Sequence, residues 1–334
     1  MRVSPEDFEV EELPAYLPSG EGTHLYLWVE KRGRNTRDVV REIARALSLP
    51  ERELGVAGQK DRHAVTRQFI SVPGKKPEAA SALEGEGWKV LSARLHTNKL
   101  RTGHLSGNRF QIRIRGCVED AAALARTTAD ALQLRGLPNA FGPQRFGHGG
   151  SNVGLGRALL ANERSPEAQR AGRDRFMRRL LISAFQAHLF NQVLAARLTE
   201  GLFASAVPGD LMKRLESGGL FVSEDPALDG PRVAAFEISP TGPMFGHRMM
   251  APRAAALGRE EAILEAEGLT LSSFERLGAD GEGTRRALRL PVKIDVAPTE
   301  DGVQLAFDLP KGSFATVVLR ELMKGDAAPE IPEE

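Results

Sequence analysis

Strand patterns and helix patterns are interleaved in the first 150 residues, and this mixture limits the fold classes open to the chain. Apolar and polar residues alternate in 90–95 and 110–115, which is the period of a half-buried strand. Residues 23–30 and 66–72 are β-rich and free of breakers, and also predict strands. Helical spacing of apolar residues in 35–50, and an Ala/Leu-rich run at 120–134, predict two helices. The sequence therefore favours an α+β domain.

The rest of the chain has a different pattern. A long amphipathic helix is expected at 173–198, followed by short strands within 206–221 and 232–250 and a helix at 259–267. Strands at 286–294 and 302–309 and a helix at 313–322 precede an acidic tail, 325–334. Gly- and Pro-rich breaks at 147–156 and 278–283 suggest the limits of a second domain, in keeping with a length of 334 residues. The pattern leaves open whether this domain follows the first or is inserted into it.

Several classes of protein are disfavoured by what the sequence lacks. A single cysteine, Cys117, excludes an intrachain disulfide and CxxC metal clusters. No apolar run approaches the roughly 18 residues of a membrane span, and the start of the chain has no secretory pattern. HExxH, phosphate-loop and GxSxG motifs are absent, and the Gly-rich run at 147–156 does not follow a hydrophobic strand. We therefore expect a cytoplasmic protein without a metal centre or dinucleotide cofactor.

Charge is distributed unevenly although the formal net charge is only +1. Residues 87–118 contain seven lysines and arginines and no acid, and residues 131–162 contain three arginines and no acid. A third block, 170–179, is rich in arginine and lies at the start of the long helix. Runs of lysine and arginine without acids are typical of a phosphate-binding face, although surface strands also carry lysines and arginines. Taken together, the three blocks favour a nucleic-acid partner.

Two short segments carry candidate chemistry. Asp61 follows a glycine turn in AGQKDRHAVTRQ, between Lys60 and Arg62, where positive neighbours would keep a carboxylate ionised and suited to nucleophilic attack. An aspartate that caps a turn would look the same. In GNRF, the amide of Asn108 and the ring of Phe110 could read and stack on a base, or Phe110 could simply point into the core.

Six ordered motifs together resemble the bacterial tRNA pseudouridine synthase D (TruD) family. They are SPEDFEV at 4–10, AGQKDRHAVT at 57–66, GNRF at 107–110, PNAFGPQRFG at 138–147, SAFQAHLFNQVLAARL at 183–198 and LPKGSFATVVLREL at 309–322. The resemblance extends from residue 2 to about residue 322 and is looser between 151 and 283 apart from the fifth motif.

This resemblance implies a pseudouridine synthase catalytic domain with an α+β fold around a mixed, mainly antiparallel sheet. The domain would comprise 1–150 and 284–324, with a TRUD-type domain inserted at 151–283 and the tail at 325–334. The implied activity is isomerisation of uridine to pseudouridine in tRNA, at position 13 in the bacterial members, without a metal or organic cofactor. A monomer with tRNA as its partner is expected, with no protein partner implied and no membrane attachment.

The resemblance also implies roles for individual residues. Asp61 matches the family's catalytic aspartate, and Arg2 falls where family members place a basic residue that pairs with it. The remaining matches line the uracil pocket, with Phe110 stacking on the base and Asn108 reading its polar edge; these residues are Phe8, Asn108, Phe110 and Phe314. Whether Asp61 attacks C1′, attacks C6, removes a proton at C2′ or stabilises a detached sugar stays open.

Two other functions fit parts of the pattern. A non-catalytic RNA-binding protein could use the basic blocks and aromatic residues, but binding alone does not require the AGQKD segment. A metal-dependent nuclease or deaminase would need clustered histidines, cysteines or paired acids, which the sequence lacks.

Overall fold

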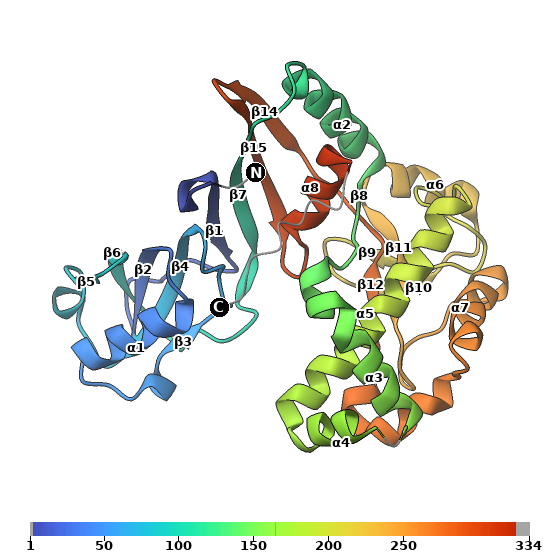
Figure 1. Ribbon diagram of the computed structural model, residues 1–334, viewed down its shortest axis with the longest axis horizontal. Helices are drawn as coiled ribbons and strands as arrows, with labels where there is room; N and C mark the ends of the chain where they lie inside the picture. The colour runs from blue at the N-terminus through green and yellow to red at the C-terminus, as the bar shows by residue number, and fades with distance from the viewer. Residues whose placement is uncertain (1–2, 164, 325–334) are drawn as a thin grey trace. The chain divides into compact units, whose positions relative to one another are not determined.

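The computed structural model describes residues 3–163 and 165–324, which divide into two compact units (Figure 1). The described part of the first unit comprises 3–130 and 292–315, and that of the second comprises 131–291 and 316–324. The chain thus leaves the first unit and returns to it. These borders separate the two compact units, and they differ from the 150/151 and 283/284 limits expected from the sequence. An insertion at 151–283 therefore stays a prediction. The predicted tail, 325–334, lies outside the described residues.

The first unit is built on one nine-stranded sheet. Eight strands run in the order β14-β15-β7-β1-β4-β2-β6-β5, and β3 pairs with β4. Only β1 and β4 are parallel; every other pair in this sheet is antiparallel. This mixed, mainly antiparallel sheet with helices confirms the predicted fold class. The strands are β1 Phe8–Pro14, β2 His24–Arg32, β3 Gly55–Val56, β4 Val65–Pro73, β5 Glu84–Gly85, β6 Trp88–His96, β7 Leu105–Arg115, β14 Ile294–Thr299 and β15 Gly302–Pro310.

Part of one face of this sheet is covered by α1 (Thr36–Ala46). Val39, Val40 and Ile43 recur at helical spacing and pack against Leu27 and Val29 of β2 in a continuous buried cluster. Full burial of each such side chain contributes about 1.5–3 kcal/mol, which holds the helix on the sheet. The helix ends at Ala46, before the expected limit near residue 50, and Ser48 then takes a positive φ of 53°.

β15, a strand from late in the sequence, lies beside β7, a strand from much earlier in the sequence. Phe307 and Asp308 of β15 pair with Phe110 and Arg109 of β7, and Figure 1 shows the red strand against the teal one. This pairing returns 294–310 to the first unit. The final helix, α8 (Ala315–Met323), follows directly.

The second unit is organised around α5 (Arg175–Thr199). Ile182, Phe185 and Leu189 of this helix are buried in a cluster with Phe245 and Phe274. The other helices of this part of the chain are α2 Ala121–Arg135, which crosses the border between the units, α3 Ser151–Ala161, α4 Pro166–Arg173, α6 Pro226–Ala234 and α7 Ala254–Ala266.

Two small sheets complete the second unit. One has the strand order β10-β9-β11-β12, and the other pairs β13 with β8. Their strands are β8 Leu137–Pro138, β9 Leu211–Arg214, β10 Leu220–Val222, β11 Ile238–Met244, β12 Thr284–Ala287 and β13 Arg289–Leu290. Across both units, 3-10 helices lie at Pro5–Asp7, Glu51–Glu53, Pro77–Ala79, Pro143–Phe146, His148–Gly150 and Leu271–Gly281.

Two expectations for this region need correction. The glycine-rich segment at 147–156 is not only a break, because α3 begins within it at Ser151 after Gly150 takes a left-handed φ of 78°. Residues 232–234 belong to a helix rather than to a strand. The helix, α6, starts where the side chain of Asp225 accepts a hydrogen bond from the N–H of Ala227 and Pro226 occupies the first turn.

Candidate active site

Asp61 lies in the loop between β3 and β4, and its side chain is exposed. Its main chain is nevertheless fixed, because the ammonium of Lys31 donates a hydrogen bond to the Asp61 carbonyl oxygen (2.7 Å). The same ammonium lies 3.4 Å from the Lys60 carbonyl oxygen. No described residue makes a hydrogen bond or ion pair with the Asp61 carboxylate. The loop therefore holds the backbone of this aspartate and leaves its side chain exposed, without a partner among the described residues.

Lys31 is a buried cation that sequence inspection missed. It is only 2% exposed, and burial lowers its pKa to about 8; the Asp61 charge partly opposes this lowering, while the charge of Lys60 adds to it. The sequence contained a signal for it. Lys31 follows Leu25, Leu27 and Val29 at the spacing of one strand face, so a lysine occupies an apolar register position.

The ammonium of Lys60 does not serve as the partner that its place beside Asp61 suggested. It donates to Oδ1 of Asn108 (2.6 Å) and lies 3.3 Å from Oε2 of Glu12. The Lys60 and Glu12 side chains are 5% and 0% exposed. Burial raises the pKa of Glu12, whereas the Lys60 charge and the Phe69 N–H, which donates to Glu12 Oε1, lower it. Sequence inspection also missed Glu12, although it breaks the face of Phe8 and Val10 on β1.

Residues from α1 and β4 fix the remainder of this loop. The Lys60 N–H donates to Oγ1 of Thr36 (3.0 Å), which itself donates to Oε1 of Gln68 (2.9 Å). The amide nitrogen of Gln68 donates to the Gly58 carbonyl oxygen (3.0 Å). Thr36 and Gln68 are buried, so these bonds form where water does not compete strongly. The loop at 58–61 is therefore attached to a helix and to two strands of the sheet.

The sheet register places Asn108 and Phe110 on one face with residues of β1. Asn108 lies opposite Glu12, and Phe110 lies opposite Val10. The Phe110 ring is stacked on Phe307 at 5.3 Å and meets the edge of Phe8 at 6.1 Å. Phe110 is 6% exposed, so its ring is largely enclosed by protein.

The structure therefore joins part of the predicted site. Lys60 connects the Asp61 loop to Asn108, and Asn108 shares a face with Phe110, which contacts Phe8. Phe314 is half-buried in the segment between β15 and α8. Arg2 lies outside the described residues.

Four of the seven basic residues in the block at 87–118 form ion pairs with acids from elsewhere in the first unit. Arg109 bonds Asp308, Arg113 bonds Asp301, and Arg115 bonds both Asp7 and Asp301. These arginines alternate with Phe110 and Ile112 and therefore lie on the opposite face of β7. The expected basic face exists on this strand, but it is a set of ion pairs on the side away from Asn108.

The block at 170–179 is different, because three of its arginines lack such partners. The side chains of Arg170, Arg173 and Arg175 are exposed and form no ion pair with the described residues. Phe176 is 74% exposed beside them. The remaining two arginines, Arg178 and Arg179, pair with Asp280.

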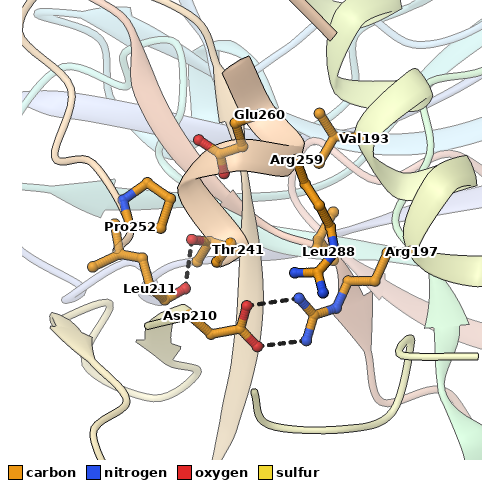
Figure 2. Close-up of a pocket in the computed structure, with 10 residues that line it drawn as sticks. Val193, Arg197, Asp210, Leu211, Thr241, Pro252, Arg259, Glu260 and Leu288 are labelled. Atoms are coloured by element: carbon orange, nitrogen blue, oxygen red, sulfur yellow. Dashed lines mark hydrogen bonds and ion pairs between the residues drawn. The ribbon is translucent and has the colours of Figure 1, made fainter. Parts of the chain in front are cut away.

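A cavity of about 20 Å³ lies in the second unit, under α7 and beside the Arg197–Asp210 ion pair (Figure 2). Its volume is near that of a single water molecule, and no predicted site residue lines it. In the part of the chain covered by the structure, no three histidines, cysteines or acids are grouped to hold a metal ion. Within those same residues, no helix has the length and apolar character needed to cross a bilayer.

Comparisons with known proteins agree across sequence and structure. The family model of tRNA pseudouridine synthase D (TruD) matches residues 1–170 and 159–322. A tRNA pseudouridine synthase D of an Anaeromyxobacter species is 59% identical over 333 residues, covering 100% of this chain and 94% of that protein. The Thermus thermophilus enzyme of that name is 44% identical over 341 residues, covering 100% and 91%.

A solved structure shows the same fold. The crystal structure of a Methanosarcina mazei protein assigned to tRNA pseudouridine synthase D (TruD) superposes with a TM-score of 0.79. The two chains are 25% identical, and the match covers 96% of this chain and 92% of that one. The chain is therefore an enzyme of the tRNA pseudouridine synthase D (TruD) family.

Proposed function

We propose that this enzyme isomerises uridine 13 of tRNA to pseudouridine, with Asp61 as the catalytic carboxylate. The observation that carries the proposal is the contrast within the Asp61 loop. Its main chain is bonded by a buried lysine, whereas its carboxylate has no partner among the described residues. A residue needed only to cap a turn would use its side chain for the turn.

The proposed reaction rearranges one nucleoside without net gain or loss of atoms. The C1′–N1 bond breaks, the uracil turns, and a C1′–C5 bond forms; C5 then loses its proton and N1 gains one. An ionised Asp61 could bond covalently to the nucleoside or stabilise positive charge on the detached sugar. The proposed site needs neither a metal nor an organic cofactor for these steps.

The target uridine must leave the tRNA stack to reach such a site. Base flipping costs a few kcal/mol, and stacking on an aromatic ring returns about 1–3 kcal/mol per base. We propose that Phe110, Phe8 and Phe314 form the apolar enclosure, with Asn108 at the polar edge of the base. We further propose that Arg2 pairs with Asp61.

We assign the exposed arginines at the α4–α5 junction to the tRNA backbone. Arg170, Arg173 and Arg175 have no protein carboxylate to neutralise them among the described residues, and the exposed ring of Phe176 lies in the same segment. Such a combination suits phosphates and an unpaired base. The enzyme would act in the cytoplasm as a monomer with tRNA as its only required partner.

The decisive experiment replaces the carboxylate without changing its size. Asp61→Asn should abolish pseudouridine formation, because an amide can neither attack carbon nor balance a cationic sugar, and tRNA affinity should stay within a few-fold of wild type. Carbodiimide labelling after incubation maps the modified uridines, and filter binding gives the dissociation constant. Asp295→Asn, at an exposed aspartate of the same unit, is the matched control. Normal turnover by Asp61→Asn would remove Asp61 from this role, and labelling elsewhere than uridine 13 would correct the target.

A further inference from the structure

The amide of Asn108 has its orientation fixed by chemistry. Its atom nearest Lys60 lies 2.6 Å from an ammonium nitrogen, and an ammonium group can donate hydrogen bonds but cannot accept them. That amide atom must therefore be Oδ1. Nδ2 consequently lies on the other side of the amide, where it donates to no described residue. Asn108 is half-buried, so part of this residue stays exposed to solvent.

Lys60 is itself held firmly at both ends. Its ammonium lies against Glu12, its side chain is 5% exposed, and its main-chain N–H donates to Thr36. Its carbonyl oxygen faces the ammonium of Lys31. Glu12 in turn accepts from the N–H of Phe69 on β4. A cation confined in this way cannot move aside to let the Asn108 amide rotate.

We propose that Lys60 sets the base specificity of the site by locking Asn108 as a hydrogen-bond donor toward the flipped base. The inference rests on the proposed function and names the residue that selects its substrate. Lys60 acts through Asn108 and is therefore a positioning residue.

The hydrogen-bonding edges of the two pyrimidines explain the selection. Uracil and cytosine both present a carbonyl oxygen at C2, so Nδ2 of Asn108 can distinguish them only at C4, where uracil presents a second carbonyl oxygen that accepts from it. Cytosine presents an amino group at C4, which would face Nδ2 donor to donor. A free asparagine amide could rotate by 180° and serve cytosine equally well. With Lys60 in place, that rotation would turn Nδ2–H2 toward an ammonium group and break a charge-assisted hydrogen bond.

The test compares two tRNA transcripts that differ only in carrying U or C at the mapped position. We expect wild type to bind the U transcript about tenfold more tightly, the value of one missing hydrogen bond and one donor left unpaired. Lys60→Met should bring the ratio close to one, whereas Lys60→Arg, which also only donates, should restore part of it. Lys89→Met is the matched control, an exposed lysine paired with a glutamate in the same sheet, and should keep the wild-type ratio.

A second variant tests the idea without removing the buried cation. Asn108→Asp keeps a bond to Lys60 but presents only acceptors to the base, so it should reverse the preference toward C. Circular dichroism checks that each variant is folded. If Lys60→Met does not fold, Asn108→Asp and the charge-free Glu12→Gln/Lys60→Met double variant replace it.

An unchanged U-over-C ratio in folded Lys60→Met or Asn108→Asp would overturn the inference, as would a wild-type ratio of one. The proposed function fails separately. Isomerisation of transcripts labelled with tritium at C5 releases that tritium, and wild type releasing none would refute the function whatever the binding ratios.

Discussion

At the scale of single residues, buried charge distinguishes this site from an ordinary turn. Lys31 and the Glu12–Lys60 pair are enclosed on the sheet face that also carries Asn108. Removing such groups from water costs several kcal/mol each, and a purely structural sheet could fill these positions with apolar side chains. Their retention around the Asp61 loop supports a role in holding that loop.

Lys31 gives the stability of the protein a predictable pH dependence. Between its folded pKa of about 8 and the ordinary value of 10.5, the folded state has lost a proton that the unfolded chain still binds. Stability therefore rises with pH through this window. The free energy of unfolding of wild type, relative to Lys31→Met, should increase by about 1 kcal/mol per pH unit between pH 8 and 10. Urea denaturation at several pH values measures this difference, and a flat difference would contradict the burial of a charged Lys31.

The sequence alone identified some residues of this site and missed others. Their motifs and the family resemblance both pointed to Asp61, Asn108 and Phe110. Lys31 and Glu12, by contrast, lie in strands that resemble ordinary amphipathic ones. Both occupy positions where the alternation calls for an apolar side chain, and that break is the available signal. Sequence adjacency also suggested that Lys60 would help to keep Asp61 ionised. A side chain can turn toward a neighbouring strand, and Lys60 bonds Glu12 and Asn108 of β1 and β7 instead.

At the scale of helices and strands, pairing between distant segments decides what a local pattern becomes. The arginines of β7 form a basic block in the sequence, but β15 and its preceding turn supply Asp308 and Asp301 as their partners. Alternation predicted β6 and β7, because it records which face of a strand is buried, and runs of β-forming residues predicted β2 and β4, but β1 was missed. Local periodicity could not predict strand order, which depends on contacts between residues far apart in sequence. It also missed α3, α4 and α6; α3 contains two glycines, and α6 contains one glycine and two prolines.

The end of α5 offers a test of how a helix is tied to the segment after it. Arg197 donates to both carboxylate oxygens of Asp210, at 2.7 and 2.5 Å (Figure 2). It also donates to the carbonyl oxygens of Leu202 and Ser205. Both charged side chains are at most 5% exposed. Arg197→Met should lower the free energy of unfolding by about 3–5 kcal/mol, because it leaves a buried carboxylate without its partner.

The matching double variant separates charge from packing. Arg197→Met/Asp210→Leu removes both charges and should recover much of that stability. Thermal denaturation of the full-length protein, followed by circular dichroism, measures both variants. If the double variant were no more stable than the single one, the effect would come from the missing hydrogen bonds to the backbone rather than from the stranded carboxylate.

At the scale of the whole molecule, the chain forms two compact units, and the candidate chemistry in the Asp61 loop belongs to the first. The sequence pattern suggested two domains, and the family resemblance implied a return of the chain to the first one. The first border between the compact units lies between residues 130 and 131, because α2 continues from one unit into the other without a break in its helix. Composition changes mark where a chain is irregular, and those places need not coincide with the limits of a packed unit.

The second unit should contribute to tRNA affinity through charge. Replacing Arg170, Arg173 and Arg175 with alanine should weaken binding of all tRNAs alike and reduce the slope of log K against log salt, by about 0.7–0.9 for each phosphate that is no longer neutralised. Filter binding at several salt concentrations measures this slope. Arg253→Ala, at an exposed arginine of the same unit that pairs with Glu224, should leave it unchanged. An unaltered slope in the triple variant would place these arginines away from the phosphates.

The late arrival of β15 beside β7 has a consequence for the protein during its synthesis. Asp301 is made 186 residues after its partner Arg115, an interval of roughly ten to forty seconds at bacterial elongation rates. Throughout that time the edge of β7 that will pair with β15 has no neighbouring strand on the nascent chain. Charged side chains discourage unintended strand addition at such an edge, and Arg109, Arg113 and Arg115 are in place before Asp301 and Asp308 emerge from the ribosome. The same arginines would thus first discourage aggregation of the growing polypeptide and later form the ion pairs that join β7 to β15 and its preceding turn.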